Sequence, residues 1–158
     1  MKVFVRNTII LIGLVIIDQA LKCFFAKTGF IANLGIFALH YVTNTGASFG
    51  MLQGNNATLA WVSVIVLGLI MLLVDKIRKE QTVPVLLIAS GIIGNLIDRV
   101  FRGFVVDFID FKFWPVFNLA DSMIVIGVVW LIVVILVKDL KKDNIEKPRR
   151  HLRRLKKS

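Results

Sequence analysis

The sequence predicts an all-α integral membrane protein whose helices cross the bilayer four times. Of its 158 residues, 57% are hydrophobic and 19% are charged, and the mean hydropathy is +0.80. Four apolar runs approach the roughly 20 residues that a helix needs to span about 30 Å of hydrocarbon. The sequence has no alternating pattern long enough for a membrane barrel. So much apolar surface excludes a water-soluble globule and a disordered chain.

The four predicted spans follow one another along the chain. The second span has 18 residues without a charge, the third has 16 and ends at Asp98-Arg99, and the fourth carries one charge, Asp121, near its start. The spans are Thr8–Phe25, Ala57–Val74, Thr82–Ile97 and Asn118–Val137.

The first span has the appearance of a cleavable signal peptide, because the basic segment Met1–Arg6 precedes the apolar run Ile9–Ile17. Asp18 and Lys22 follow this run directly, and no convincing small-residue cleavage site comes after them. We therefore interpret the segment as a retained helix.

Basic residues orient the predicted bundle. They precede the first span, lie between the second and third spans (Lys76, Arg78 and Lys79), and fill the segment Lys138–Ser158, which has ten basic and three acidic residues. Both termini are therefore predicted to be cytoplasmic, although Arg99, Arg102 and Lys112 in an outer loop argue weakly against this.

We divide the chain into a single four-helix membrane domain, 1–140, and a basic cytoplasmic tail, 141–158. The tail suits water or anionic lipid. It has no interleaved aromatic residues and follows a membrane span, so we expect no nucleic-acid partner.

The two outer loops, 26–56 and 98–117, are expected to fold back onto the membrane surface. The first contains a strand-like run at 36–42, and the second is rich in aromatic residues, which favour the membrane interface.

Polar residues inside membrane spans are costly, so each requires a reason. Asp18 and Lys22 lie four positions apart and predict an ion pair on one helix face. Small residues such as Gly94 let helices approach closely, and Asn95 can form hydrogen bonds across helices. Asp98 and Arg99 are expected to pair with each other or with loop groups.

Asp107 and Asp121 allow two interpretations. In the first, Asp121 is a cap or first-turn acid of the fourth helix and Asp107 is an ordinary loop acid. In the second, the two carboxylates meet at the outer membrane boundary, where only one of them ionises readily. Such a pair can activate water and hydrogen-bond a substrate carbonyl, as in aspartic proteases. The residues alone leave both interpretations open.

Other chemistries have less support. The single cysteine, Cys23, excludes an internal disulfide and a cysteine-based zinc cluster, and no histidine pattern matches a metal site. A proton relay or small transporter is a rival interpretation, because ionisable groups lie within the spans. A relay should distribute them across the membrane, whereas here they gather toward the outer ends. A structural or assembly protein with acidic helix caps is a third possibility.

Five sequence blocks, in order, resemble lipoprotein signal peptidase (signal peptidase II), a bacterial family of membrane aspartic endopeptidases. The blocks are Asp18-Gln19-x-x-Lys22, Asn44-x-Gly46-Ala47-x-Phe49, Gly94-Asn95-x-x-Asp98-Arg99, Val105-Val106-Asp107-Phe108 and Phe117-Asn118-x-Ala120-Asp121-Ser122. The resemblance implies a catalytic pair of Asp107 and Asp121, with no metal or cofactor. It also implies a small outer-surface β-like cradle, which the 36–42 run fits, and a mobile outer loop that closes over the site.

The remaining block residues take supporting roles by the same resemblance. Those matching positions that line or support the substrate site are Asn44, Asn95, Arg99 and Asn118. Those matching mostly structural positions are Asp18, Lys22, Gly46, Ala47, Asp98 and Ala120.

The resemblance further implies a substrate, a reaction and a location. The substrate is a diacylglyceryl-modified prolipoprotein, which is cut immediately before its lipidated cysteine. The enzyme is expected in the bacterial cytoplasmic (inner) membrane, in contact with membrane lipid, with its active site near the outer face. One complete site per chain makes a monomer sufficient.

Overall fold

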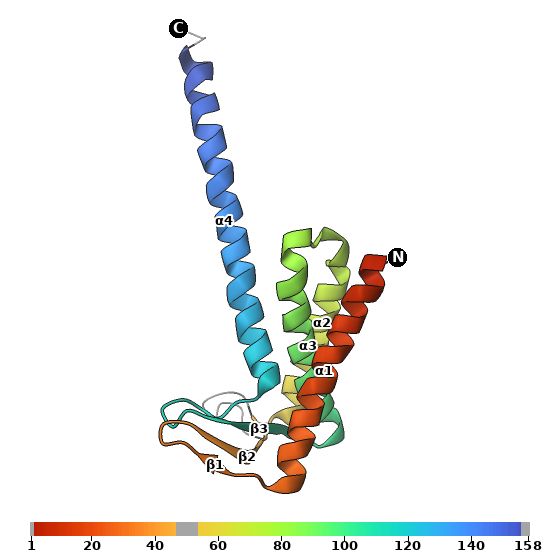
Figure 1. The fold of residues 1–158 in the computed structure, drawn as a ribbon. Coiled ribbons are helices and arrows are strands. Elements are labelled where there is room, and N and C mark those ends of the chain that lie inside the picture. Colours follow the sequence, from red (N-terminus) through yellow and green to blue (C-terminus); the bar gives the residue numbers. More distant parts are fainter. Residues whose placement is uncertain (1, 47–53, 156–158) are drawn as a thin grey trace.

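The computed structural model describes residues 2–46 and 54–155, and it is mostly helical (Figure 1). A three-stranded sheet lies at one end of the helices, and the chain termini lie toward the other end. The helices are α1 (Lys2–Thr28), α2 (Asn56–Leu72), the short 3-10 helix η2 (Val74–Lys76), α3 (Lys79–Phe101) and α4 (Leu119–Leu155). The strands are β1 (Ala32–Asn33), β2 (Ala38–Asn44) and β3 (Val105–Asp110).

Among the described residues, three helical segments are long and apolar enough to cross a membrane: Val3–Thr28, Lys79–Phe101 and Leu119–Lys138. The second predicted span, Ala57–Val74, corresponds to α2, a shorter apolar helix of 17 residues. The architecture therefore suits a membrane protein, and the count of four spans stays a prediction. In addition, α4 continues to Leu155, through most of the predicted basic tail.

The predicted end of the third span is wrong by several residues. We expected an outer loop from residue 98, but α3 continues to Phe101 and includes Asp98 and Arg99. The helix can contain the Asp98 carboxylate because that carboxylate has partners: Lys22 of α1 at 3.1 Å and Arg102 at 2.6 Å. Hydropathy alone gave no sign of these partners.

The sheet joins two segments that are far apart in the sequence. Its strand order is β1-β2-β3, and both pairs are antiparallel. The predicted strand-like run at 36–42 corresponds to β2, displaced by two residues. β3 lies in the aromatic-rich segment that we expected to be an interfacial loop, and it pairs Val42 with Asp107 and Asn44 with Val105.

Apolar packing fixes the sheet against the helices. The ring of Phe25 in α1 stacks on that of Phe108 in β3, with centroids 4.5 Å apart and an interplanar angle of 9°. Val105, Val106 and Phe108 are all buried. β3 is therefore held against the ends of α1 and α3, and this packing places Asp107 of β3 close to both helices.

Helix α3 lies at the centre of the bundle, and α1, α2 and α4 all contact it. Close approach of α3 and α4 depends on small residues. A Cβ atom on Gly91 would overlap the Ala120 carbonyl oxygen and lie 2.7 Å from Ile124 Cγ1, and one on Gly127 would lie 2.8 Å from the Pro84 carbonyl oxygen. This agrees with the prediction that small residues in the third span permit close helix packing.

Gly91→Ala is therefore expected to destabilise the protein by about 1–3 kcal/mol, because the added methyl group pushes α4 away from α3. The measurement is the thermal unfolding midpoint in detergent. Gly68→Ala in α2 is the matched control, since its Cβ would meet no atom within 4 Å among the described residues. Equal midpoints for the two variants would contradict the packing argument.

Candidate active site

The Asp107 carboxylate is positioned by the strand register. Asn44 opposes Val105, two residues before Asp107, so the side chains of Asn44 and Asp107 are diagonal neighbours on one face of the sheet. Asn44 Nδ2 donates a hydrogen bond to Asp107 Oδ2 at 2.8 Å. Asn44 Oδ1 accepts from the Gly46 backbone N–H at 2.9 Å, which directs the amide nitrogen toward the carboxylate.

The Asp121 carboxylate is positioned by the start of α4. Asn118 immediately precedes the helix, and its Oδ1 accepts from the Asp121 backbone N–H at 2.9 Å. In return, Asp121 Oδ2 accepts from the Asn118 backbone N–H at 3.1 Å. This reciprocal pair is a capping box. Asp121 is thus a first-turn acid, as one interpretation of the sequence proposed, and this role holds its carboxylate still.

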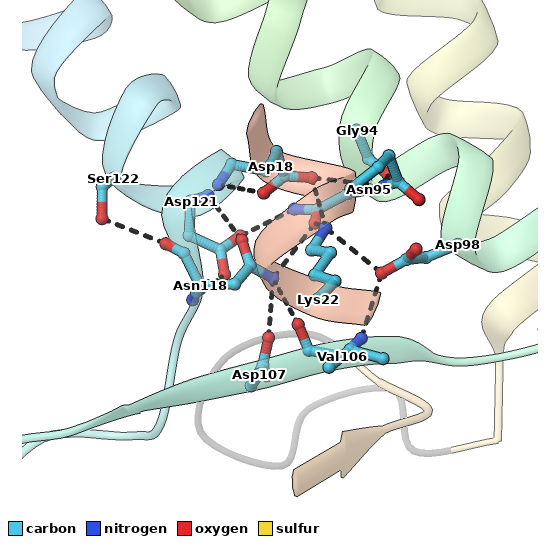
Figure 2. Close-up of polar contacts among 12 residues, drawn as sticks. Asp18, Lys22, Gly94, Asn95, Asp98, Val106, Asp107, Asn118, Asp121 and Ser122 are labelled. Atoms are coloured by element: carbon cyan, nitrogen blue, oxygen red, sulfur yellow. Dashed lines mark hydrogen bonds and ion pairs between the residues drawn. The ribbon is translucent and has the colours of Figure 1, made fainter. Parts of the chain in front are cut away.

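Asn118 connects the two aspartates (Figure 2). Its Nδ2 donates to Asp107 Oδ1 at 2.7 Å, while its Oδ1 caps the helix that carries Asp121. The preceding residue, Phe117, exchanges backbone hydrogen bonds with Ile109 at 2.8 and 3.0 Å, which fixes Asn118 beside β3. The buried Asn118 side chain is therefore hydrogen-bonded both to the carboxylate of Asp107 and to the backbone N–H of Asp121.

Asn95 of α3 supports the pair from the helix side. Its Nδ2 donates to Asp121 Oδ1 at 2.8 Å. Its Oδ1 accepts from Lys22 Nζ at 2.9 Å and from Asn118 Nδ2 at 3.1 Å. The ammonium group of Lys22 therefore holds the amide oxygen of Asn95, so that the amide nitrogen faces Asp121.

Lys22 is fully buried and has a partner for each of its three protons. Besides Asn95, its Nζ contacts Asp18 Oδ2 at 2.9 Å and Asp98 Oδ2 at 3.1 Å (Figure 2). The predicted pair of Asp18 and Lys22 is confirmed. Asp98 pairs with Lys22 and Arg102, and its Oδ2 accepts from the Val106 backbone N–H at 3.1 Å, which links α1, α3 and β3.

Asp18 also reaches the start of α4. Its Oδ1 accepts from the backbone N–H of Ala120 at 2.9 Å. A Cβ atom on Gly94 would lie 3.2 Å from Asp18 Cγ, so this glycine makes room for the carboxylate. The buried carboxylate of Asp18 thus helps to fix the helix turn that carries Asp121.

A cavity of about 220 Å³ opens beside this network. Its polar lining includes Asn44, Asn95, Arg99 and Asp121, and most of the apolar lining comes from α2, α3, α4 and β3. Asp107 is only 1% exposed and connects to the cavity through Asn44. Arg99 lies within electrostatic reach of both Asp107 and Asp121. A polar group entering the cavity would therefore meet a carboxylate, two amides and a guanidinium.

Burial, and to a smaller extent the nearby charge of Asp121, raises the pKa of Asp107 from 3.8 to about 7. The hydrogen bonds from Asn44 and Asn118 act in the opposite direction. Burial thus favours the protonated form of Asp107. Asp110, at the end of the same strand, has a lowered pKa, because the Lys112 backbone and side chain donate hydrogen bonds to it.

The structure brings together all but one of the predicted site residues. The hydrogen-bonded group contains or borders six of them: Asp107, Asp121, Asn44, Asn95, Asn118 and Gly46. Arg99 lines the cavity. The buried support of the group is formed by Asp18, Lys22, Asp98 and Ala120. Ala47 lies outside the described residues.

Sequence reasoning missed the apolar wall of the cavity and some of the supporting polar contacts. Leu59, Val62 and Ser63 of α2 line the cavity, on a helix to which we had given no role. Their spacing places them on one helix face, but nothing in the sequence showed that this face borders the carboxylates. Gln19 Nε2 donates to the Gly94 carbonyl oxygen at 3.0 Å, joining α1 to α3.

Metal ligands do not gather in the described part of the chain. Within residues 2–46 and 54–155, no three His, Cys, Asp or Glu side chains lie close enough together to hold a metal ion.

Comparison with known proteins identifies the family. The family model described as signal peptidase (SPase) II matches residues 10–137. A lipoprotein signal peptidase of Halothermothrix orenii is 46% identical over 99 residues, covering 61% of this chain and 68% of the relative. One from Clostridioides difficile is 43% identical over 114 residues, covering 67% of this chain and 74% of the relative.

Solved structures agree with these relatives. Two structures titled as bacterial membrane enzymes superpose with TM-scores of 0.78 and 0.73, at 32% and 31% identity. The first superposition covers 87% of this chain and 90% of the solved chain. The second covers 83% of this chain and 92% of the solved chain. The family match, which extends over most of the chain, and the shared fold lead to one conclusion: this chain belongs to the signal peptidase II family.

Proposed function

We propose that this protein is an aspartic endopeptidase that removes the signal peptide from diacylglyceryl-modified prolipoproteins, cutting immediately before the lipidated cysteine. The observation that carries the proposal is that Asp107 and Asp121 are both hydrogen-bonded to Asn118, next to a polar-lined cavity. Membership of the signal peptidase II family supports the substrate class.

The surroundings of the two carboxylates support different roles. Asp107 has its pKa raised to about 7, so it can hold a proton at neutral pH and donate it. Asp121 accepts hydrogen bonds at both oxygens and lies in the first turn of α4, where the helix dipole favours negative charge. We therefore assign Asp121 as the general base and Asp107 as the general acid.

The reaction needs one water molecule between the pair. Asp121 takes a proton from this water as its oxygen attacks the scissile carbonyl carbon. Asp107 donates its proton to the carbonyl oxygen, giving a neutral tetrahedral intermediate. The carbon–nitrogen bond then breaks, and Asp121 returns its proton to the amine of the cysteine. Asp107 recovers its proton from the hydroxyl group as the new carboxyl group forms.

The setting fits a substrate that arrives within the membrane. A signal peptide with an attached diacylglyceryl group reaches an enzyme only through lipid, and the cavity lies between apolar helices at the sheet end of the bundle. With four spans and both termini in the cytoplasm, this end faces outward from the bacterial inner membrane. We further propose that a monomer is active and that an outer segment closes over the site.

The distribution of polar groups supports an enzyme over a proton relay. The buried charged residues of α1, α3 and β3, together with Asn95, gather near the start of α4. Among its described residues, α2 has no buried side chain at all and no charged residue. A relay would require polar groups along the helices, so a localised site suits the geometry better.

The test of the proposal is cleavage of a diacylglyceryl-modified prolipoprotein by the purified full chain in detergent. We expect cleavage before the modified cysteine, unchanged by EDTA, and at least tenfold slower cleavage of the same precursor without its lipid. Mass spectrometry of the released peptide locates the bond. A folded protein that cleaves neither substrate would contradict the proposal, and proton flux in liposomes would then test the relay.

The activity is expected to fall on the alkaline side of pH 7. Because the proposed acid must be protonated, kcat/KM should decrease about tenfold per pH unit above the pKa of Asp107, which is about 7. The measurement is a pH profile of cleavage between pH 5 and 9. Asp110→Asn, a nearby acid on the same strand, is the control and should leave the alkaline limb in place. A profile flat to pH 9 would exclude Asp107 as the acid.

A further inference from the structure

A second cavity lies farther along the same crevice as the proposed active site. It has a volume of about 440 Å³ and is formed by the same three helices, at the end that carries η2. On α2, the outer cavity is lined by Leu59, Val62 and Ser63, and the inner one by Val66, Leu69 and Ile70. These residues recur at helical spacing, so one face of α2 borders both cavities.

The crevice exists because the backbones of α2 and α4 lie apart. Both helices pack on α3, but over the residues that the structure describes no Cα atom of α2 lies within 8 Å of one of α4. Figure 1 shows α4 leaning away from α2 and α3 toward its C-terminal end. Leu131 and Ile135 of α4 form the wall of the inner cavity opposite α2.

The lining of the inner cavity is apolar except at its end. There Lys76 of η2 and Gln81 of α3 contribute polar groups. Lys138 of α4 lies 3.9 Å from Glu80 of α3, so a further basic side chain borders the same region. With Arg78 and Lys79, basic residues outnumber Asp75 and Glu80 at this end of the helices.

The size of the cavity distinguishes among occupants. An α-helix is about 10–12 Å wide with a pitch of about 5.4 Å, so roughly one turn would fill 440 Å³. A flexible acyl chain needs less width. Signal peptides also begin with a positively charged segment, which the basic groups at this end would repel. A negatively charged lipid headgroup is attracted to the same groups.

We propose that the inner cavity binds an anionic phospholipid of the cytoplasmic leaflet, with an acyl chain between α2 and α4 and its phosphate beside Lys76. The leaflet rests on the orientation given under the proposed function, but binding itself is independent of the Asp107 and Asp121 chemistry. The bound lipid fills the crevice that separates α2 from α4.

Native mass spectrometry of the full chain tests this proposal. The protein is released from nanodiscs that contain equal amounts of phosphatidylglycerol and phosphatidylcholine. We expect one phosphatidylglycerol to be retained in preference to phosphatidylcholine. Lys76→Gln should lower this retention about fivefold, as expected for one basic group near an anionic headgroup, whereas Lys27→Gln at the far end of α1 should not change it.

A second pair of variants tests the apolar part. Leu131→Trp fills the cavity and should abolish retention, whereas Val129→Trp, an exposed residue of α4 outside the lining, should not. The same spectra recorded on Asp107→Asn should show wild-type lipid retention. Lipid binding can therefore be judged even if the peptidase proposal fails. Unfolding midpoints establish that each variant is folded.

Three results would overturn the proposal. Equal retention of phosphatidylcholine and phosphatidylglycerol would show that the basic residues do not select an anionic headgroup. Normal lipid retention by Leu131→Trp with loss of cleavage would assign the crevice to the substrate helix. A dimer that Leu131→Trp dissociates would assign it to a second copy of the chain.

Discussion

Asparagine at either position 107 or position 121 is expected to lower kcat for cleavage of a lipidated prolipoprotein by about 1,000-fold or more, with the fold intact. General acid–base catalysis contributes about 100- to 10,000-fold per group. An amide at position 121 cannot take the proton of the attacking water, and an amide at position 107 cannot protonate the carbonyl oxygen. The measurement is initial-rate cleavage by purified variants, and Asp110→Asn is the control.

The double variant sharpens this prediction. Groups that act as a unit are not additive, so Asp107→Asn with Asp121→Asn should be about as slow as either single variant. If the loss of kcat in the double variant equals the product of the two single losses, the carboxylates act in separate steps. Full activity in either single variant would exclude the pair, and the remaining interpretation of helix cap and loop acid would then be sufficient.

Asp107→Asn should also change how stability depends on pH. The folded-state pKa of Asp107, about 7, lies above the ordinary value of 3.8. The folded protein therefore holds this proton more tightly, and the resulting stability is present at low pH and lost as pH rises through 7. Unfolding midpoints of wild type and Asp107→Asn, measured from pH 5 to 8, should show a smaller loss in the variant.

The parts of the fold that depend on local sequence were predictable. Hydropathy located the apolar helices, because burying a polar backbone in lipid demands helices of known length. The ion pair of Asp18 and Lys22 followed from helical spacing alone. The strand-like run before Asn44 was found within two residues, since β-branched and aromatic residues favour a strand.

The contacts that build the candidate site depend on tertiary register, which a single sequence does not reveal. Asn44 and Asp107 are 63 positions apart and meet only because β2 and β3 pair in one register. β3 itself was missed, because its aromatic neighbours were interpreted as interfacial anchors. The pair of Lys22 and Asp98 requires a particular rotation of α1 against α3. Residue chemistry left two interpretations of the aspartates open, and the family resemblance selected between them.

Removal of the Lys22 charge is expected to cause the largest loss of stability in the molecule. Lys22→Met keeps the length of the side chain but leaves the carboxylates of Asp18 and Asp98 without their shared cation. Both carboxylates are 0% exposed, so neither recovers solvation by water. Breaking a buried ion pair in this way typically costs about 3–5 kcal/mol. The thermal midpoint in detergent measures the effect, and Lys27→Met, an exposed lysine on the same helix, should change it little.

A compensating variant separates charge from packing. Lys22→Met combined with Asp18→Asn removes one of the uncompensated charges, while the amide oxygen introduced by the second substitution can still accept the hydrogen bond from the Ala120 N–H. This double variant should therefore recover part of the lost stability.

Activity should not return with stability. Asn95 has lost the ammonium group that holds its amide oxygen, so its nitrogen is no longer directed to Asp121. A Lys22→Met protein as stable as wild type would show that the buried network contributes no net stability. Full activity in the compensated variant would show that the link from Lys22 through Asn95 to Asp121 has no part in catalysis.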